Sequence, residues 1–121
     1  MPVRALRCAT QVDADDRDQL VDATAELMAA VLERNGIDSE DLISVVFTTT
    51  PDLTAEFPAY AARSMGLTDV PFLCASEIAV PGAMPRVVRL LAHVEAGFAR
   101  RDARHVYLRG AAALRTDLPR D

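Results

Sequence analysis

The stretch Leu42–Thr49 constrains the fold more than any other part of the sequence. Its β-branched and aromatic residues predict a buried strand, and the turn-forming sequence Thr50-Pro51-Asp52 ends it. The chain has 121 residues, of which 50% are hydrophobic, so it is long enough for one folded core but short for two. We therefore expect a single domain spanning residues 1–121, built around a sheet that contains this strand.

Three other segments are candidate strands. The segment Pro2–Val12 alternates, with Val3, Ala5 and Arg7 on one face and Arg4, Leu6 and Cys8 on the other. The run Val70–Ala75 predicts a strand that leads directly to Glu77. The last candidate strand is Val106–Leu114, in which Gly110 indicates a bulge or a close approach of two backbones.

Helix signals lie between these strands. The acidic cluster 13–18 supplies an N-cap and favourable first-turn charges, and Asn35-Gly36 is a typical helix end. The apolar residues of this helix follow the 3.6-residue period: Leu20, Val21, Leu27, Met28, Val31 and Leu32. A second, short helix is expected over Ala59–Met65, with Pro58 in its first turn and Gly66 at its end.

The segment Val87–Glu95 is ambiguous. Its length and lack of helix breakers permit a helix, whereas its many branched residues permit a strand, and periodicity does not decide between them. Arg89 interrupts the apolar run in either case.

Composition excludes several classes of function. The formal net charge of -5 argues against a nucleic-acid or anionic-membrane surface, either of which would need a continuous basic face. No apolar run approaches the roughly 20 residues that span a bilayer, and neither terminus resembles a targeting signal. Cys8 and Cys74 are far apart and are expected to be reduced thiols. We expect a cytoplasmic protein.

The usual catalytic sets are missing from the sequence. His93 and His105 have no metal-ligand spacing to either cysteine, and no glycine-rich loop could hold a nucleotide, so we expect neither metal nor cofactor. Spacing alone leaves open a nucleophilic pair formed by Cys74 and a histidine. A cysteine in an apolar strand is usually a core residue, however, and we assign no nucleophile.

Arginines provide the strongest functional signal. All 13 basic residues are arginines, and Arg7, Arg63, Arg89 and Arg115 lie at segment ends around the acidic residue Glu77. Arginine pairs with carboxylates in bidentate fashion, and Glu77 could accept a hydrogen bond from a ligand hydroxyl. Taken singly, each arginine is more often a solvated surface residue. Together with the phenol of Tyr107, they predict a site for a small dicarboxylate that also carries a hydroxyl.

Two long motifs make that site specific. They are Thr50-Pro51-Asp52-Leu53-x-Ala55-x-Phe57-Pro58-Ala59-x-Ala61-x-Arg63, and Arg104-His105-Val106-Tyr107-Leu108 with Leu114-Arg115-x-Asp117-Leu118. These motifs, with Val70-Pro71-x-x-Cys74-x-x-Glu77, resemble those of the small monofunctional chorismate mutases of the trimeric α/β type. The resemblance implies a strand over Val87–Glu95 and an α/β (α+β) domain, with a mixed β-sheet and helices on one side. It also implies a homotrimer that forms a pseudo-α/β-barrel.

The resemblance further implies the conversion of chorismate to prephenate in phenylalanine and tyrosine biosynthesis, a [3,3] rearrangement that needs no base, nucleophile, metal or cofactor. Arg89 would donate to the ether oxygen, where negative charge develops. Arg7 and Tyr107 would hold the carboxylate of the enolpyruvyl group. Glu77 and the backbone at Cys74 would hold the ring hydroxyl.

A neighbouring subunit would complete the site, because this family places its sites between subunits. Phe57, Ala59 and Arg63 would come from that neighbour. Arg63 and Arg115 would close over the mouth of the site and attract the ring carboxylate, with Leu114 packed beside them. Two departures from the family pattern concern the rim: Tyr60 stands where a lysine is expected, and residues 81–85, Pro-Gly-Ala-Met-Pro, form a stiffer loop than usual.

Two other functions remain as alternatives. One is a non-catalytic trimeric protein that binds a small carboxylate as a regulator. The other is an enamine or imine deaminase of the trimeric kind, which has a similar architecture and also uses an arginine for a carboxylate. The motif from Thr50 to Arg63 does not resemble the signature of that deaminase family.

Overall fold

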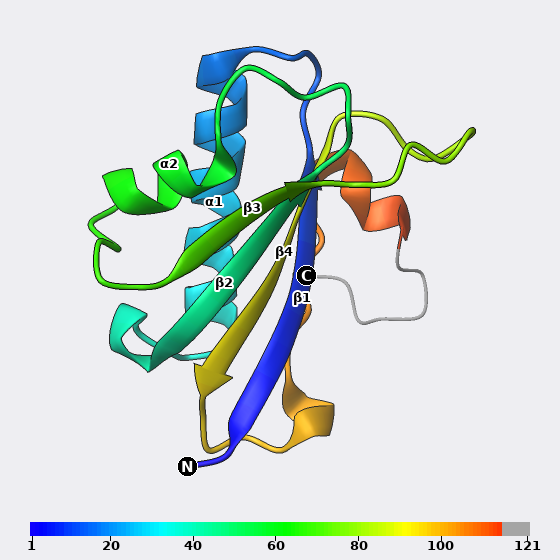
Figure 1. Ribbon diagram of the computed structural model, residues 1–121. Helices are drawn as coiled ribbons and strands as arrows, with labels where there is room; N and C mark the ends of the chain where they lie inside the picture. Colours follow the sequence, from blue (N-terminus) through cyan, green and yellow to red (C-terminus); the bar gives the residue numbers. More distant parts are fainter. Residues whose placement is uncertain (115–121) are drawn as a thin grey trace.

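The chain forms one four-stranded mixed sheet, seen in a computed structural model that describes residues 1–114 (Figure 1). The strands are β1 (Val3–Gln11), β2 (Leu42–Thr49), β3 (Phe72–Ser76) and β4 (Val87–Glu95), and their order across the sheet is β1-β4-β2-β3. The β4 strand runs antiparallel to both β1 and β2, whereas β2 and β3 are parallel. Val87–Glu95 is therefore a strand, as the family resemblance implied.

Two helices, α1 (Arg17–Arg34) and α2 (Pro58–Ser64), pack on the same side of the sheet (Figure 1). The side chain of Asp16 accepts a hydrogen bond from the Gln19 N–H and so caps α1, which ends at Asn35. Pro58 begins α2 as the first-turn proline that the sequence predicted. The predicted mixed sheet with helices on one side is confirmed.

The main core lies between the helices and the sheet. Leu6 and Cys8 of β1, Phe47 of β2 and Leu90 of β4 are at most 2% exposed, and they pack with Leu27, Met28 and Val31 of α1. This arrangement confirms the 3.6-residue pattern of α1 except at Val21 and Leu32, which are only half-buried. Three short 3-10 helices complete the described elements: η1 (Ser39–Asp41), η2 (Arg100–Asp102) and η3 (Arg109–Leu114).

The other side of the sheet is covered only in part. There η3 packs over the ends of β1 and β4, where Ala9, Val87 and Ala111 form a small buried cluster. Farther along this face, Leu91 of β4 and Leu73 of β3 flank Val46 of β2, and their exposed fractions are 37% and 64%. An apolar strip thus remains in contact with solvent in the single chain.

The prediction of a final strand over Val106–Leu114 is wrong. Only Tyr107 forms a bridge, parallel to Ala9, after which Arg109 adopts a positive φ of 53° and the chain continues as η3. The alanines that follow Gly110 favour a helix once the chain has turned away from β1. Gly110 itself is a close approach, as the sequence suggested, because a Cβ there would overlap the side chain of Gln11.

Within residues 1–114 no helix is long and apolar enough to cross a membrane. The same residues contain no group of three or more His, Cys, Asp or Glu side chains that could hold a metal ion.

Candidate active site

The site is centred on Arg89, in the interior strand β4. In the sheet register Arg89 lies opposite Ala9 of β1 on one side and Thr48 of β2 on the other. Tyr107 forms a bridge with Ala9, so Thr48, Arg89, Ala9 and Tyr107 form a row across the sheet that extends beyond its edge strand β1. Because directly paired residues project to the same face, the side chains of Arg89 and Thr48 both lie on the face without α1 and α2.

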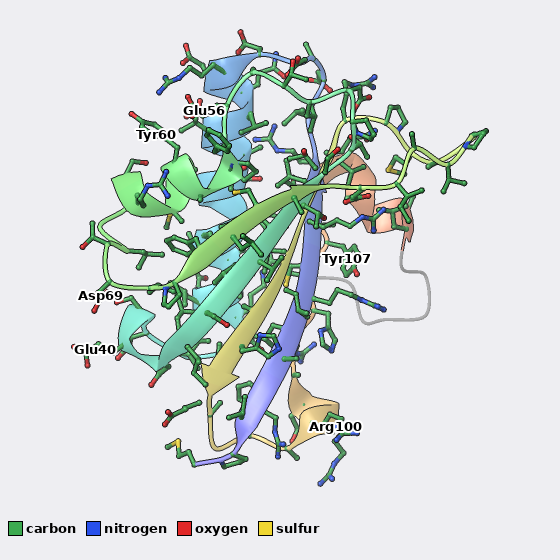
Figure 2. The ribbon with its side chains drawn as sticks, viewed as in Figure 1. Glu40, Glu56, Tyr60, Asp69, Arg100 and Tyr107 are labelled. Carbon is green, nitrogen blue, oxygen red and sulfur yellow. The ribbon has the colours of Figure 1, made fainter. Side chains whose placement is uncertain are left out.

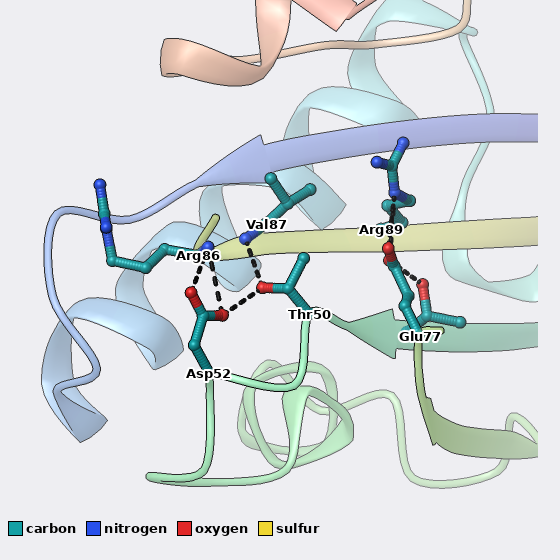
Figure 3. A network of polar contacts seen from close by, with 7 residues as sticks. Thr50, Asp52, Glu77, Arg86, Val87 and Arg89 are labelled. Carbon is teal, nitrogen blue, oxygen red and sulfur yellow. Dashed lines mark hydrogen bonds and ion pairs between the residues drawn. The ribbon is translucent and has the colours of Figure 1, made fainter. Parts of the chain in front are cut away.

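Glu77 joins this row from the end of β3. Its N–H donates to the carbonyl oxygen of Thr49 at 2.8 Å, which anchors the residue beside β2. Its carboxylate accepts a hydrogen bond from Thr48 Oγ1 at 2.7 Å, and Arg89 Nε donates to both of its oxygens, at 3.1 and 3.3 Å (Figure 3). The carboxylate is therefore held by two strands before any ligand arrives.

This pairing directs the guanidinium of Arg89. Glu77 occupies the Nε edge, and Figure 3 shows the outer end of the guanidinium pointing away from Glu77. The side chains are only partly exposed, 35% for Arg89 and 20% for Glu77, so solvent screens the pair incompletely. A fixed guanidinium of this kind can donate to an oxygen on which negative charge develops.

Arg7 lies on the same face, one step farther along β1. In the register it is opposite Leu91, two residues from Arg89, and it is exposed. Its backbone N–H donates to His105 Nδ1 at 3.1 Å, and the N–H of the following Val106 donates to Cys8 Sγ at 3.3 Å. Burial lowers the pKa of His105. The segment that carries Tyr107 is thus attached to the edge of β1 beside Arg7.

A second polar network fixes the start of β4. Thr50 Oγ1 accepts a hydrogen bond from the Val87 N–H at 3.0 Å and donates to the Asp52 carboxylate (Figure 3). That carboxylate also accepts from the backbone N–H of Arg86, which adopts a positive φ of 55°. The network therefore holds the strained residue next to β4 and sets the position from which Arg89 projects.

Sequence reasoning did not assign roles to Thr48, Thr50 or Asp52. The signal was available only in part, since Thr50-Pro51-Asp52 was identified as a turn and as part of a family motif. A threonine in a β-branched run looks like any other strand residue, and its hydrogen-bond partners come from distant segments.

We expect Thr50→Val to lower the free energy of unfolding by about 1–3 kcal/mol, because the buried Val87 N–H loses its acceptor. Thr50→Ser keeps the hydroxyl and should lose much less. Urea denaturation of the three proteins measures both effects. No loss in the valine variant would show that the hydrogen bond does not contribute, and a loss confined to the serine variant would assign the effect to methyl packing.

The remaining predicted residues are not gathered around Arg89 within one chain. Arg63 and Ala59 belong to α2, on the opposite side of the sheet, and Ala59 is buried in the main core. Phe57, 66% exposed, lines a hollow of about 450 Å³ at the ends of β2 and β3 together with Cys74. Leu114 ends η3 and packs against the Ala9 cluster. Arg115 lies outside the described residues.

The two cysteines differ in their surroundings. Both are free thiols, but Cys8 is fully buried, and burial raises its pKa to about 12, whereas Cys74 is half-buried. The thiolate is the reactive form, so we expect an aromatic disulfide reagent at pH 8 to label Cys74 in the folded protein and Cys8 only after unfolding. Peptide mapping by mass spectrometry measures both rates. Similar rates in the folded protein would contradict the burial of Cys8.

Tyr60 stands where the family resemblance led us to expect a lysine, and the structure shows its surroundings. The guanidinium of Arg17 stacks on the Tyr60 ring, 4.7 Å from its centroid, and is also paired with Glu56 at 3.0 Å (Figure 2). A positive charge therefore remains beside the position where a lysine was expected. The loop that contains the two prolines has Gly82 at a positive φ of 85°.

The fold and the paired arginine define a small α/β protein with an arginine held in place on an open sheet face. A family model described as chorismate mutase type I matches residues 3–118. The chain belongs to that family, so the resemblance found in the sequence is confirmed.

Individual relatives agree along nearly the whole chain. The chorismate mutase AroH of Thermus thermophilus is 49% identical over 117 residues, with 96% of each protein covered. AroH of Bacillus subtilis (strain 168) is 34% identical over 119 residues, with 98% of this chain and 94% of the relative covered. A solved structure of the chorismate mutase from Clostridium thermocellum superposes with a TM-score of 0.89 at 42% identity, covering 90% of this chain and 97% of the other.

Proposed function

We propose that this chain catalyses the rearrangement of chorismate to prephenate and that Arg89 is its central electrostatic group. The reaction is assigned from the chain's membership of the chorismate mutase type I family and from its near full-length similarity to chorismate mutases. The contacts among Arg89, Glu77 and Thr48 support Arg89 as the central group, because they hold its guanidinium in place without a ligand.

The reaction suits a site that binds and orients. In the [3,3] rearrangement the ether carbon–oxygen bond breaks while a carbon–carbon bond forms, and no proton moves to or from the protein. Arg89 would donate to the ether oxygen as charge develops there. Arg7 and Tyr107, neighbours along the edge of β1, would hold the enolpyruvyl carboxylate, which favours the compact conformer that brings the reacting carbons together.

Glu77 would accept a hydrogen bond from the ring hydroxyl, assisted by the backbone at Cys74. The register supports a backbone contact, because Cys74 pairs with the core residue Phe47 and its side chain therefore lies on the helix side. Glu77 would keep its bond from Thr48 while it takes the hydroxyl. Two fixed strands then position the ring.

We also propose that the active form is a homotrimer with sites between subunits. Arg63 and Phe57 lie with α2, and one chain does not bring them to Arg89, so a second copy would have to supply them. The exposed apolar strip of Leu73 and Leu91 is a surface that such an assembly would bury. The free thiols are consistent with a cytoplasmic location.

The test is direct: purified protein is mixed with chorismate, and the loss of chorismate and the appearance of prephenate are followed together. Conversion supports the proposal. A folded protein that binds chorismate without converting it would favour a carboxylate-binding regulator, whereas ammonia release from an enamine would favour a deaminase. The comparisons give neither alternative any support.

A further inference from the structure

A basic hollow lies at the N-terminal end of β1, away from Arg89. Its volume is about 380 Å³, and its lining comes from the N-terminal part of β1 and from the segment around η2. The lining residues are Val3, Arg4, Ala5, Arg100, Ala103 and His105. Three of the six are basic and none is acidic, in a protein whose formal net charge is -5.

Two of the basic groups are already oriented. Arg4 Nε donates to the carbonyl oxygen of Phe98 at 2.9 Å, which fixes the guanidinium and leaves its terminal nitrogens as the remaining donors. His105 Nδ1 accepts the Arg7 N–H, so the neutral ring carries its proton on Nε2 and is a donor there. Arg100 lies on η2 beside the first half of β1 (Figure 2).

We propose that this hollow is a binding site for a small oxyanion, a carboxylate or a phosphate, held by Arg4, Arg100 and His105. Guanidinium groups form paired hydrogen bonds with both kinds of anion, and an imidazole N–H adds a third direction. The volume is at the lower end of the range for small-molecule sites, which suits a compact ligand.

The same contacts connect the hollow to the proposed active site. His105 accepts a hydrogen bond from the backbone of Arg7 and stands two residues before Tyr107. Arg7 and Tyr107 are the two residues proposed to hold the enolpyruvyl carboxylate. An anion bound to His105 would therefore alter the hydrogen bond between His105 and the Arg7 N–H, and with it the position of Arg7 on β1. This second step depends on the proposed function, whereas the binding step does not.

The experiment titrates the full chain with inorganic phosphate at constant ionic strength and follows the His105 ring and the Arg7 amide by NMR. A separate titration with acetate distinguishes the phosphate and carboxylate chemistries. We expect saturable shifts and a rise in the pKa of His105, because a bound anion stabilises the imidazolium. Arg100→Gln should weaken binding by about tenfold or more, since it removes a charged partner.

Arg101→Gln is the matched control, because Arg101 is adjacent on η2 but does not line the hollow. Arg101→Gln and Arg89→Ala should both retain the affinity of the unchanged protein. Equal affinity in Arg100→Gln and Arg101→Gln, or shifts that grow without saturation, would overturn the proposal. Loss of binding in Arg89→Ala alone would assign the anion to the active site and would also overturn it.

Discussion

Arg89→Ala is expected to lower kcat/KM for chorismate by about 10²–10³-fold, as when one oxyanion-hole donor is removed. The reason is that the guanidinium donates to the ether oxygen only as charge develops, so its loss raises the barrier more than it weakens substrate binding. The fall should therefore appear mainly in kcat. Steady-state kinetics with chorismate measure kcat and KM separately.

Two controls make this result specific. Arg89→Lys keeps the charge but not the fixed planar donor, so it should recover little of the loss. Arg101→Ala changes an exposed arginine outside the site and should leave kcat unchanged. Circular dichroism must show that Arg89→Ala is folded, since the substitution also unpairs Glu77. A folded Arg89→Ala variant with normal kcat would remove Arg89 from the mechanism.

Local signals explain why much of the fold could be predicted. Asp16, Asn35, Pro58 and Gly66 act within one or two turns of the chain, and each lies where the sequence placed a helix end. The alternation of Val3–Cys8 likewise reports which face of β1 is buried, whereas Ala9 and Thr10 are both buried because η3 covers the other face there. Such signals depend on backbone geometry next to the residue, so distant segments do not alter them.

Residues 106–114 show where local reasoning fails. A strand there would need a partner along its whole length, but η3 instead packs Ala111 against Ala9 and Val87. The sequence of this segment does not reveal that the Ala9 surface needs covering. The prediction of a strand over Val106–Leu114 was wrong because it took no account of this packing, which uses the helix-favouring alanines after Gly110.

In the candidate site, too, some residues could be predicted from the sequence and others could not. Arg89 and Glu77 were predicted together from the resemblance, and the structure brings them into contact at 3.1 Å. The Thr48 hydroxyl that holds Glu77 was missed, because no short-range pattern links residue 48 to residue 77. The pairing of Arg17 with Tyr60 was missed for the same reason, as it joins α1 to α2.

If each site is shared between two subunits, two variants with low activity should complement each other when they assemble into mixed trimers. Arg89→Ala removes the central donor, and Arg63→Glu reverses a charge, at an exposed position of α2, that would attract the ring carboxylate. Each variant alone should have much lower kcat/KM than the unchanged protein. Reassembled in equal amounts, they should recover about a quarter of wild-type activity, the share of sites that receive an intact Arg89 from one chain and an intact Arg63 from its neighbour.

The recovery is measured at low chorismate concentration after co-refolding, with each variant refolded separately as the reference. Arg101→Glu provides the matched control, because it reverses a surface charge on η2, far from α2 in the chain, and should be fully active by itself. Recovery requires that α2 of one copy reaches the open face of another, as expected from its position on the helix side of the sheet. A mixture whose activity equals the mean of the two variants would mean that one chain supplies the whole site, and Arg63 would then have no role beside Arg89.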